Sequence, residues 1–185
     1  MGALSRAFAR GGLFALFVGL QIASPSAKAA GVALTPERMA ELQQINNHVN
    51  STIQEVSDME HYGREDVWRI PTDGKGDCED FALLKRKLLV QRGWPASALS
   101  ISLGMTAQGE AHAVLTVATL QGDYVLDNLR SAVLPAASTG ITFHSRQSGA
   151  KPGQWVSATT GEQSSAPYAD FVIGPAKNRV AQRDR

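Results

Sequence analysis

The chain has a single cysteine, Cys78, among its 185 residues. One cysteine cannot form an internal disulfide, and it cannot supply the paired thiols of a CxxC metal site. The histidines are scattered and form no HExxH motif, which argues against a zinc site; they are His48, His61, His112 and His144. The lone thiol is therefore either a small buried apolar group or a reactive one.

Long apolar runs are also missing, since a membrane-spanning helix needs roughly 20 apolar residues. The apolar stretch at residues 11–23 is shorter; it follows Arg6 and Arg10 and precedes Ala27-Lys28-Ala29. A basic start, a short apolar run and an A-x-A site are the layout of a secretory signal peptide. We expect residues 1–29 to be a signal peptide and the mature protein, without a membrane span, to lie outside the cytoplasm. An uncleaved membrane anchor is the alternative.

The chain has no large excess of charge of either sign, with 18 basic and 17 acidic residues. Arg6, Arg10 and Lys28 lie in the expected signal, which has no acid, so the mature part has 15 basic and 17 acidic residues, a net charge of −2. This balance argues against a nucleic-acid partner. A composition with 43% hydrophobic and 19% charged residues is typical of a folded domain and excludes a disordered chain.

The periodicity predicts helices first and strands afterwards. Apolar residues recur at helical spacing over residues 35–60, after a Thr35-Pro36 start. A second helix is predicted from about Asp77 to Arg92, with acids in its first turn and Lys85 among the bases that follow. Strands are expected at residues 99–103, 111–120, 124–126, 155–156 and 171–173. This order predicts an α+β domain.

Cys78 lies where the second helix begins, after the glycine-rich segment Gly74-Lys75-Gly76. The free amide groups of a helix's first turn stabilise a thiolate, whereas the neighbouring acids Asp77, Glu79 and Asp80 raise the pKa of a thiol. Two explanations for these acids are open. Asp77 caps the helix while Asp80 reaches back, or the acids bind a hard cation such as Ca²⁺.

A nucleophilic thiolate also needs a base and a group that orients the base. His112 lies in an apolar β-like run and Asp127 ends the next one, so that Cys78, His112 and Asp127 form a candidate triad. Taken singly, His112 is typical of a satisfied core residue and Asp127 of a turn former.

The spacing of the two strands sets a condition on this triad. A tight hairpin centred between Gln121 and Gly122 would place Asp127 opposite Thr116, about 13 Å along the strand from His112. The triad therefore requires a bulge, a wider loop or a different pairing of the strands.

Four motifs resemble the bacterial transglutaminase-like cysteine proteinase family, which includes LapG-type periplasmic proteases. They are Trp68-Arg-Ile-Pro71, Gly74-x-Gly-Asp-Cys-Glu-Asp-Phe-Ala82, His112-Ala-Val-Leu and Val125-Leu-Asp-Asn-Leu129, and the resemblance covers residues 37–157. It implies a papain/transglutaminase-like core in which a helix-borne cysteine packs against an antiparallel sheet. The chain departs from the family pattern at Thr72-Asp-Gly, where a glutamate-containing turn is expected, and at Phe81, where tyrosine is more usual.

The resemblance also implies roles for single residues. Cys78 is expected to be the nucleophile, His112 the general base and acid, and Asp127 the residue that orients the imidazole. Asp77, Glu79 and Asp80 are expected to bind calcium. Trp68 matches an exposed tryptophan to which the family's membrane receptor binds, so the resemblance implies a partner-binding role for it.

At the level of the whole protein, the resemblance implies a calcium-dependent cysteine endopeptidase of the periplasm. Its substrate would be a large cell-surface adhesin, cut near the amino-terminal end so that cells leave a biofilm, and an inner-membrane cyclic-di-GMP receptor would sequester it. We expect the proteinase domain to span residues 30–175 and residues 176–185 to be a charged, disordered tail. Acyl transfer of the transglutaminase or amidase type, and a catalytically inactive binding module, are the alternatives.

Overall fold

The structure is a computed structural model that describes residues 31–149, 151 and 153–164. The expected signal peptide, the expected strand at residues 171–173 and the tail at residues 176–185 lie outside the described residues. The helices are α1 (Pro36–Thr52), α2 (Asp58–Tyr62) and α3 (Cys78–Gln91), with short 3-10 turns at Ala96–Ala98 and Ala136–Ser138. The strands are β1 (Gln54–Glu55), β2 (Lys75–Gly76), β3 (Leu99–Met105), β4 (Ala111–Thr119), β5 (Gly122–Leu126), β6 (Leu134–Pro135), β7 (Thr142–Gln147) and β8 (Trp155–Ser157).

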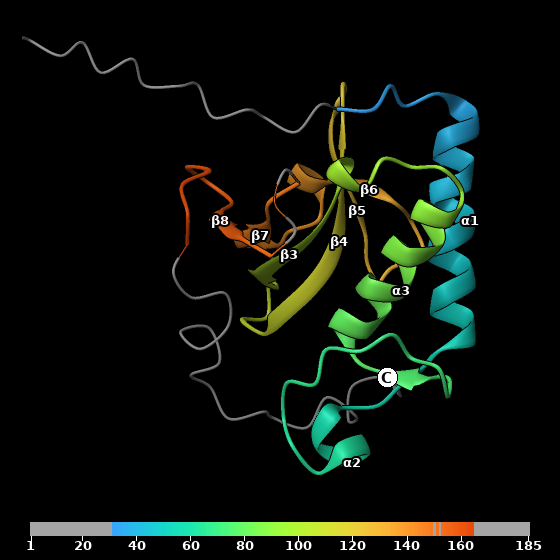
Figure 1. The fold of residues 1–185 in the computed structure, drawn as a ribbon, viewed down its shortest axis with the longest axis vertical. Coiled ribbons are helices and arrows are strands. Elements are labelled where there is room, and N and C mark those ends of the chain that lie inside the picture. The colour runs from blue at the N-terminus through green and yellow to red at the C-terminus, as the bar shows by residue number, and fades with distance from the viewer. Residues whose placement is uncertain (1–30, 150, 152, 165–185) are drawn as a thin grey trace, which may run out of the picture.

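Six strands form one antiparallel sheet in the order β6-β5-β4-β3-β7-β8. The short strands β1 and β2 pair separately and in parallel. Helices α1 and α3 lie together beside the sheet, and α2 lies beyond the end at which α3 begins (Figure 1). The predicted α+β class, with the cysteine on a helix that packs against an antiparallel sheet, is confirmed.

The core lies between α3, α1 and the central strands. Its fully buried side chains include Leu42 and Ile45 of α1, Leu89 of α3, Ile101 of β3 and Leu115 of β4. Burying such residues supplies most of the free energy of folding, about 1.5–3 kcal/mol for each large apolar side chain. Cys78 belongs to the same cluster of buried side chains, so the site described below lies against this core.

The first predicted helix is too long. The structure ends α1 at Thr52, Ile53 is extended, and a new helix α2 begins at Asp58. Ile53 and Val56 continue the helical apolar spacing, but Gln54 and Glu55 form β1 beside β2 instead. The Ser57 side chain accepts a hydrogen bond from Glu60 N, so that it caps the new helix. This break matters for the site because it turns α2 toward the start of α3.

The helix predicted at Asp77–Arg92 is confirmed, with Asp77 at the N-cap and Arg92 at the C-cap. The strand at 99–103 is confirmed, but its serines do not face solvent as alternation predicts. Ser102 is buried and accepts a hydrogen bond of 2.8 Å from the Thr116 hydroxyl, since β3 lies between β4 and β7. Strand β7 was not predicted, because Thr142–Gln147 is mostly polar and shows no apolar alternation.

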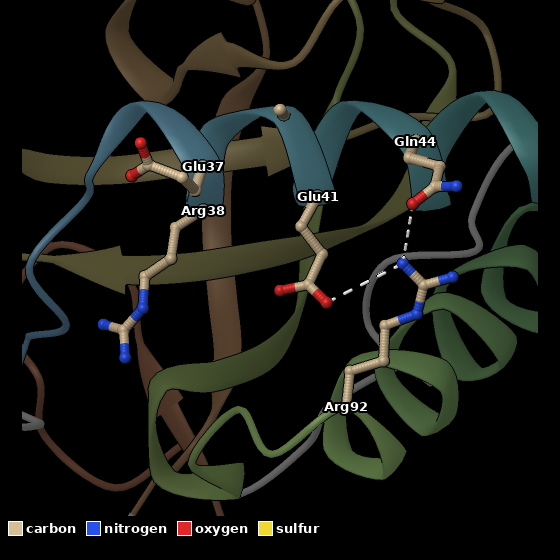
Figure 2. A pocket seen from close by; sticks show the side chains of 6 residues that line it. Glu37, Arg38, Glu41, Gln44 and Arg92 are labelled. Carbon is tan, nitrogen blue, oxygen red and sulfur yellow. Dashed lines mark hydrogen bonds and ion pairs between the residues drawn. The ribbon is translucent and has the colours of Figure 1, made fainter.

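Helix α1 is fastened to the carboxyl end of α3 by polar contacts. Arg92 donates a hydrogen bond of 2.8 Å to Gln44 Oε1 and lies 3.7 Å from a carboxylate oxygen of Glu41, beside a surface hollow (Figure 2). The other oxygen of Glu41 accepts a hydrogen bond of 2.7 Å from Trp94 Nε1. These contacts hold α1 against the carboxyl end of α3. None of the helices in the described ranges is long and apolar enough to cross a membrane.

Candidate active site

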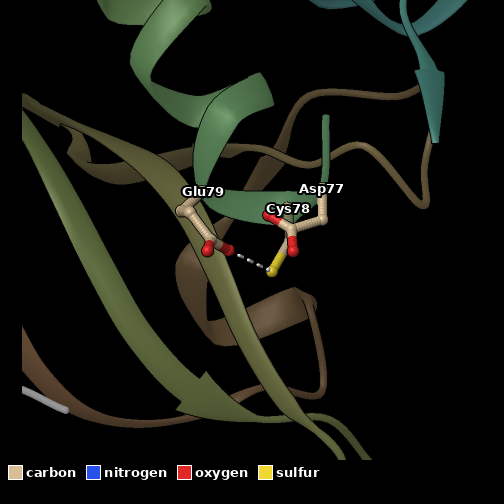
Figure 3. Close-up of side chains that lie close together, drawn as sticks. All are labelled: Asp77, Cys78 and Glu79. Atoms are coloured by element: carbon tan, nitrogen blue, oxygen red, sulfur yellow. Dashed lines mark hydrogen bonds between the residues drawn. The ribbon is translucent and has the colours of Figure 1, made fainter. Parts of the chain in front are cut away.

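Cys78 is the first residue of α3 and is only 4% exposed. Its backbone amide belongs to the first turn of the helix, where amide groups have no partner within the helix and favour a thiolate. The thiol lies 3.2 Å from Glu79 Oε2, to which it donates a hydrogen bond (Figure 3). The predicted position of the cysteine at a helix start is therefore confirmed.

His112 and Asp127 are in direct contact, with 2.8 Å between His112 Nε2 and Asp127 Oδ1. Both side chains are buried, each with 4% of its surface exposed. His112 lies on β4, and Asp127 follows the last residue of β5. The structure thus joins two of the three residues of the predicted triad.

The predicted hairpin register is wrong by two residues. The structure pairs Thr119 with Gly122, so that the turn is one residue earlier than predicted. The Thr119 hydroxyl accepts a hydrogen bond from Gln121 N, and Gly122 has a φ of 113°, a value that favours glycine. In this register, Asp127 comes opposite Val114 rather than Thr116, so that His112 is a diagonal neighbour on the same face, within reach of its side chain. A different pairing of β4 and β5, without a bulge, is what brings Asp127 to His112.

The charge of Asp127 determines the tautomer of His112. Burial opposes this charge, but hydrogen bonds from His112 and Leu129 N and the charges of His112 and Lys85 outweigh burial, and the pKa of Asp127 lies below its ordinary value. A carboxylate only accepts hydrogen bonds, so His112 Nε2 carries the proton and donates it. Nδ1 is then the basic nitrogen of the neutral imidazole.

Helix α3 packs against β4, which brings the element that carries Cys78 onto the strand that carries His112. A thiol at a helix start, a histidine and a buried carboxylate that orients it are the parts of a nucleophilic triad. This arrangement can activate a thiol for attack on a carbonyl carbon.

The three acids around Cys78 do not form one group. Glu79 is 2% exposed and turns toward the thiol (Figure 3). Burial, followed by the neighbouring charge of Asp77, raises the pKa of Glu79 to about 9, so that in the absence of a cation Glu79 is a neutral acid at pH 7. Asp77 holds the N-cap position, but its side chain makes no capping hydrogen bond, so that part of the capping explanation is wrong.

A second group brings Asp77 and Asp80 together with Asp58 of α2, with one carboxylate oxygen of each within 4.8 Å of the others. Asp58 was not predicted as a ligand, because in the sequence it falls within the single helix predicted over residues 35–60. The break between α1 and α2 brings it to the start of α3. The remaining predicted ligand, Glu79, lies in an overlapping cluster with Asp77 and Cys78.

The group of Asp58, Asp77 and Asp80 fits a hard cation. Asp58 Oδ2 accepts a hydrogen bond from Val67 N, and Asp80 Oδ1 accepts one of 2.8 Å from Arg69 N. The other oxygens of Asp58 and Asp80 are buried without a hydrogen-bond partner among the described residues. Buried oxygens of this kind need a donor or a cation, and several carboxylates at one point are the ligands that Ca²⁺ prefers.

Electrostatics and packing support the same interpretation. Burial, then the charges of Asp77 and Asp58, raise the pKa of Asp80 to about 7, which a cation would reverse. Gly76 permits the close approach of Asp80, because a Cβ atom at Gly76 would lie 2.6 Å from Asp80 Oδ2. The glycine-rich segment therefore leaves the space that the Asp80 side chain occupies in the acidic cluster.

Trp68 is half-buried rather than freely exposed. Its ring packs edge-to-face against Trp155 at 5.7 Å between centroids, and its Nε1 donates a hydrogen bond of 2.9 Å to Asp66. Part of the indole remains accessible, which keeps Trp68 available as a contact residue.

Lys85 is the site residue that the sequence pattern misplaced. The pattern puts it among the bases of α3, yet it is fully buried, and its Nζ has no hydrogen-bond partner among the described residues. Burial lowers the pKa of Lys85 to about 7, against the opposing effect of the Asp127 charge. Nζ lies 5.8 Å from the centroid of the Phe81 ring.

The burial of Lys85 leads to a prediction about stability. Between pH 7 and pH 10 the unfolded chain binds a proton at Lys85 that the folded protein does not, so this residue makes the free energy of unfolding rise with pH. We expect Lys85→Met to remove a slope of about 1 kcal/mol per pH unit. Urea unfolding at pH 7, 8 and 9 measures it, and contributions common to both proteins cancel.

The exposed Lys87 of the same helix offers the matched control, Lys87→Met, which should keep the wild-type slope. Parallel plots of unfolding free energy against pH for wild type and Lys85→Met would contradict the prediction.

Three solved structures of LapG from Legionella pneumophila are similar to this chain. One is 30% identical with a TM-score of 0.51, and the match covers 58% of this chain and 63% of the LapG chain. The match therefore spans less than two thirds of the length of that LapG chain. A calcium-bound form is 26% identical with a TM-score of 0.59, covering 75% and 78%, and an EGTA-treated form is 28% identical with a TM-score of 0.57, covering 68% and 70%.

Comparison with curated protein sequences gives no match. The profile of the family described as "bacterial transglutaminase-like cysteine proteinase BTLCP" matches residues 21–163, which is most of the chain. The chain therefore belongs to the bacterial transglutaminase-like cysteine proteinases.

Proposed function

We propose that this protein is a calcium-dependent cysteine endopeptidase of the periplasm that uses Cys78, His112 and Asp127. The observation that carries the proposal is the buried hydrogen bond between His112 and Asp127, on a strand that packs against the helix that starts with Cys78. A histidine oriented in this way has one nitrogen held and the other basic, which is what a thiol nucleophile requires.

In the proposed reaction, His112 takes the thiol proton and the thiolate of Cys78 attacks a peptide carbonyl. The Cys78 backbone amide helps to hold the oxyanion at the start of α3. The imidazolium then protonates the leaving amine, and a thioester forms. His112 next takes a proton from water, whose oxygen attacks the thioester carbonyl. The bond to sulfur breaks, the new carboxyl end is released, and the Cys78 sulfur takes the proton back from the imidazolium.

Calcium would be held by Asp58, Asp77 and Asp80, which differs from the sequence-based set in adding Asp58 and in assigning Glu79 to the thiol. Bound calcium supplies positive charge that offsets the carboxylates next to Cys78. The support is the pair of buried oxygens on Asp58 and Asp80 that lack a hydrogen bond. LapG, to which this chain is similar, has been solved in a calcium-bound form.

The location and partners are also part of the proposal. The layout of residues 1–29 supports export through a signal peptide. A large surface adhesin, cut near its amino-terminal end, is the proposed substrate, and a cyclic-di-GMP receptor in the inner membrane is the proposed regulator, with Trp68 as a contact. The support for these partners is the family resemblance and the accessible part of the indole.

The triad makes a first prediction. Cys78→Ala, His112→Ala and Asp127→Asn should each lower peptide hydrolysis by at least about 10³-fold. The rate of Cys78 alkylation, measured against pH, should give a thiol pKa below the ordinary value of about 8.5 in the wild type, and this activation should be lost in His112→Ala. His48→Ala, at an exposed position on α1, is the control and should match wild type.

A wild-type thiol of ordinary pKa that is indifferent to His112 would contradict the triad. Product mass separates hydrolysis from its acyl-transfer alternative, because an amine acceptor adds its own mass to the product whereas water leaves a carboxylate.

The calcium site makes a second prediction. Asp58→Asn and Asp80→Asn should weaken calcium binding measured by titration calorimetry at least tenfold, because each removes a charged ligand. Calcium at a hundred times its dissociation constant should stabilise the wild type by about 2.7 kcal/mol, and EGTA should abolish this gain. Glu60→Gln, an exposed acid of α2, is the matched control. Equal calcium affinities in all four proteins would contradict the site.

The role in biofilm release makes a third prediction. A strain with Cys78→Ala should retain its adhesin and fail to leave the biofilm, and Trp68→Glu should prevent capture by the receptor while purified enzyme keeps its peptidase activity. An inactive binding module predicts the opposite: Cys78→Ala would behave as wild type, and only Trp68→Glu would change the phenotype. Normal shedding by the Cys78→Ala strain would therefore refute the proposed substrate.

A further inference from the structure

One face of α1 presents carboxamide side chains to the segment that follows β5. Asn50 Nδ2 donates hydrogen bonds of 2.9 Å to the carbonyl of Asp127 and 3.0 Å to that of Arg130. Asn46 Nδ2 donates bonds of 2.8 Å to Arg130 and 3.0 Å to Ser131. Because residues four apart in a helix lie on the same side, the two asparagines act on one stretch of backbone.

A third amide extends this face. Gln43 Nε2 donates to the Ser131 carbonyl, and Gln43 Oε1 accepts a bond of 3.1 Å from Val133 N. The segment from Asp127 to Val133 is thus held along its length by side chains of α1 and belongs to neither helix nor sheet. Its first residue is the carboxylate that orients His112.

Inside this segment the Asp127 side chain is fixed by local bonds. Its Oδ1 accepts from Leu129 N at 2.9 Å as well as from His112, and its Oδ2 lies 3.8 Å from Arg130 Nε. These bonds fix the carboxylate relative to its own backbone. The position of that backbone relative to β4 and His112 depends on what holds the carbonyls, and Asn50 holds the carbonyl of Asp127 itself.

The two asparagines also lower the free energy of unfolding, because each has a buried oxygen without a hydrogen-bond donor among the described residues. Asn46 is fully buried, and the Oδ1 atoms of both Asn46 and Asn50 are buried without a hydrogen-bond partner among the described residues. A buried acceptor without a donor costs free energy. Only the donor half of each amide is used, and in each case it is used on backbone next to the triad.

We propose that Asn50, supported by Asn46, is a positioning residue for the triad, which holds the Asp127 backbone so that its carboxylate meets His112. This inference rests on the proposed function, because it assigns a role in the reaction of Cys78. The asparagines touch neither the reacting atoms nor the substrate. They act through Asp127, and a displacement of Asp127 changes the orientation and basicity of the imidazole.

The test compares Asn50→Ala and Asn46→Ala with His48→Ala, at an exposed position on the same helix. All are assayed as full-length mature protein at a temperature at which each remains folded by circular dichroism. Asn50→Ala should lower kcat for peptide hydrolysis about 10- to 100-fold, because a shift of about 1 Å in a catalytic group costs this much, while KM changes less than threefold. Asn46→Ala should have a smaller effect in the same direction, and His48→Ala should match wild type.

A second readout does not depend on turnover. The proton that His112 Nε2 shares with Asp127 should give a low-field signal in the nuclear magnetic resonance spectrum, assigned by its loss in His112→Ala. In Asn50→Ala this signal should weaken or exchange faster, and the pH profile of Cys78 alkylation should shift toward that of Asp127→Asn. A purely structural clamp would lower the melting temperature without changing either property.

The outcomes separate the two proposals. If Asn50→Ala melts earlier but keeps the wild-type kcat, low-field signal and alkylation profile, the positioning role is refuted and the triad stands. If the wild type hydrolyses no peptide, the proposed function fails, while the signal in Asn50→Ala still decides whether Asn50 positions Asp127.

Discussion

Asp127 carries a negative charge at a place that water hardly reaches, and much of the site is arranged around that charge. Its carboxylate is 4% exposed and accepts hydrogen bonds from His112 Nε2 and Leu129 N. A buried carboxylate is stable only if donors and positive charge replace its lost hydration. The register of β4 and β5 provides the imidazole, and the turn after β5 provides the backbone amide. The amides of α1 in turn hold that turn, and Lys85 of α3 adds a buried amine.

The acids around Cys78 set a different constraint. A thiolate is disfavoured by nearby negative charge, and the acids gathered at the start of α3 would oppose activation if all were ionised. The structure gathers the acids into two clusters that share Asp77. Burial keeps Glu79 protonated beside the thiol in the absence of a cation, whereas Asp58, Asp77 and Asp80 converge on a common point suited to a cation. A nucleophilic cysteine can therefore lie beside these acids, because Glu79 contacts the thiol as a neutral acid and the charges of the other three can be offset by a cation.

Several parts of this arrangement were predictable from local chemistry. The start of α3 follows from a helical apolar pattern after glycines, and it places Cys78 in the first turn. The α+β class follows from the change in periodicity after residue 98, and His112 and Asp127 were identified from their places at β-like runs. The predicted hairpin register, by contrast, was wrong. The sequence alone did not distinguish a turn centred after Leu120 from one centred after Gln121, and the contacts of the Thr119 hydroxyl and the conformation of Gly122 select the first.

The sequence by itself determined the candidates for the chemistry, because it has one cysteine at a predicted helix start, one histidine in an apolar strand and one aspartate after the next strand. Only the tertiary structure decided which other residues surround and position these candidates. Asp58 joins the acidic cluster because α1 ends at Thr52 and α2 turns toward α3, and no periodicity marks that turn. Lys85 and Asn46 have the residue types of a solvated helix face, and their burial depends on which side of each helix faces the rest of the fold. Long-range packing sets that side, and packing is a property of all the elements together rather than of any local pattern.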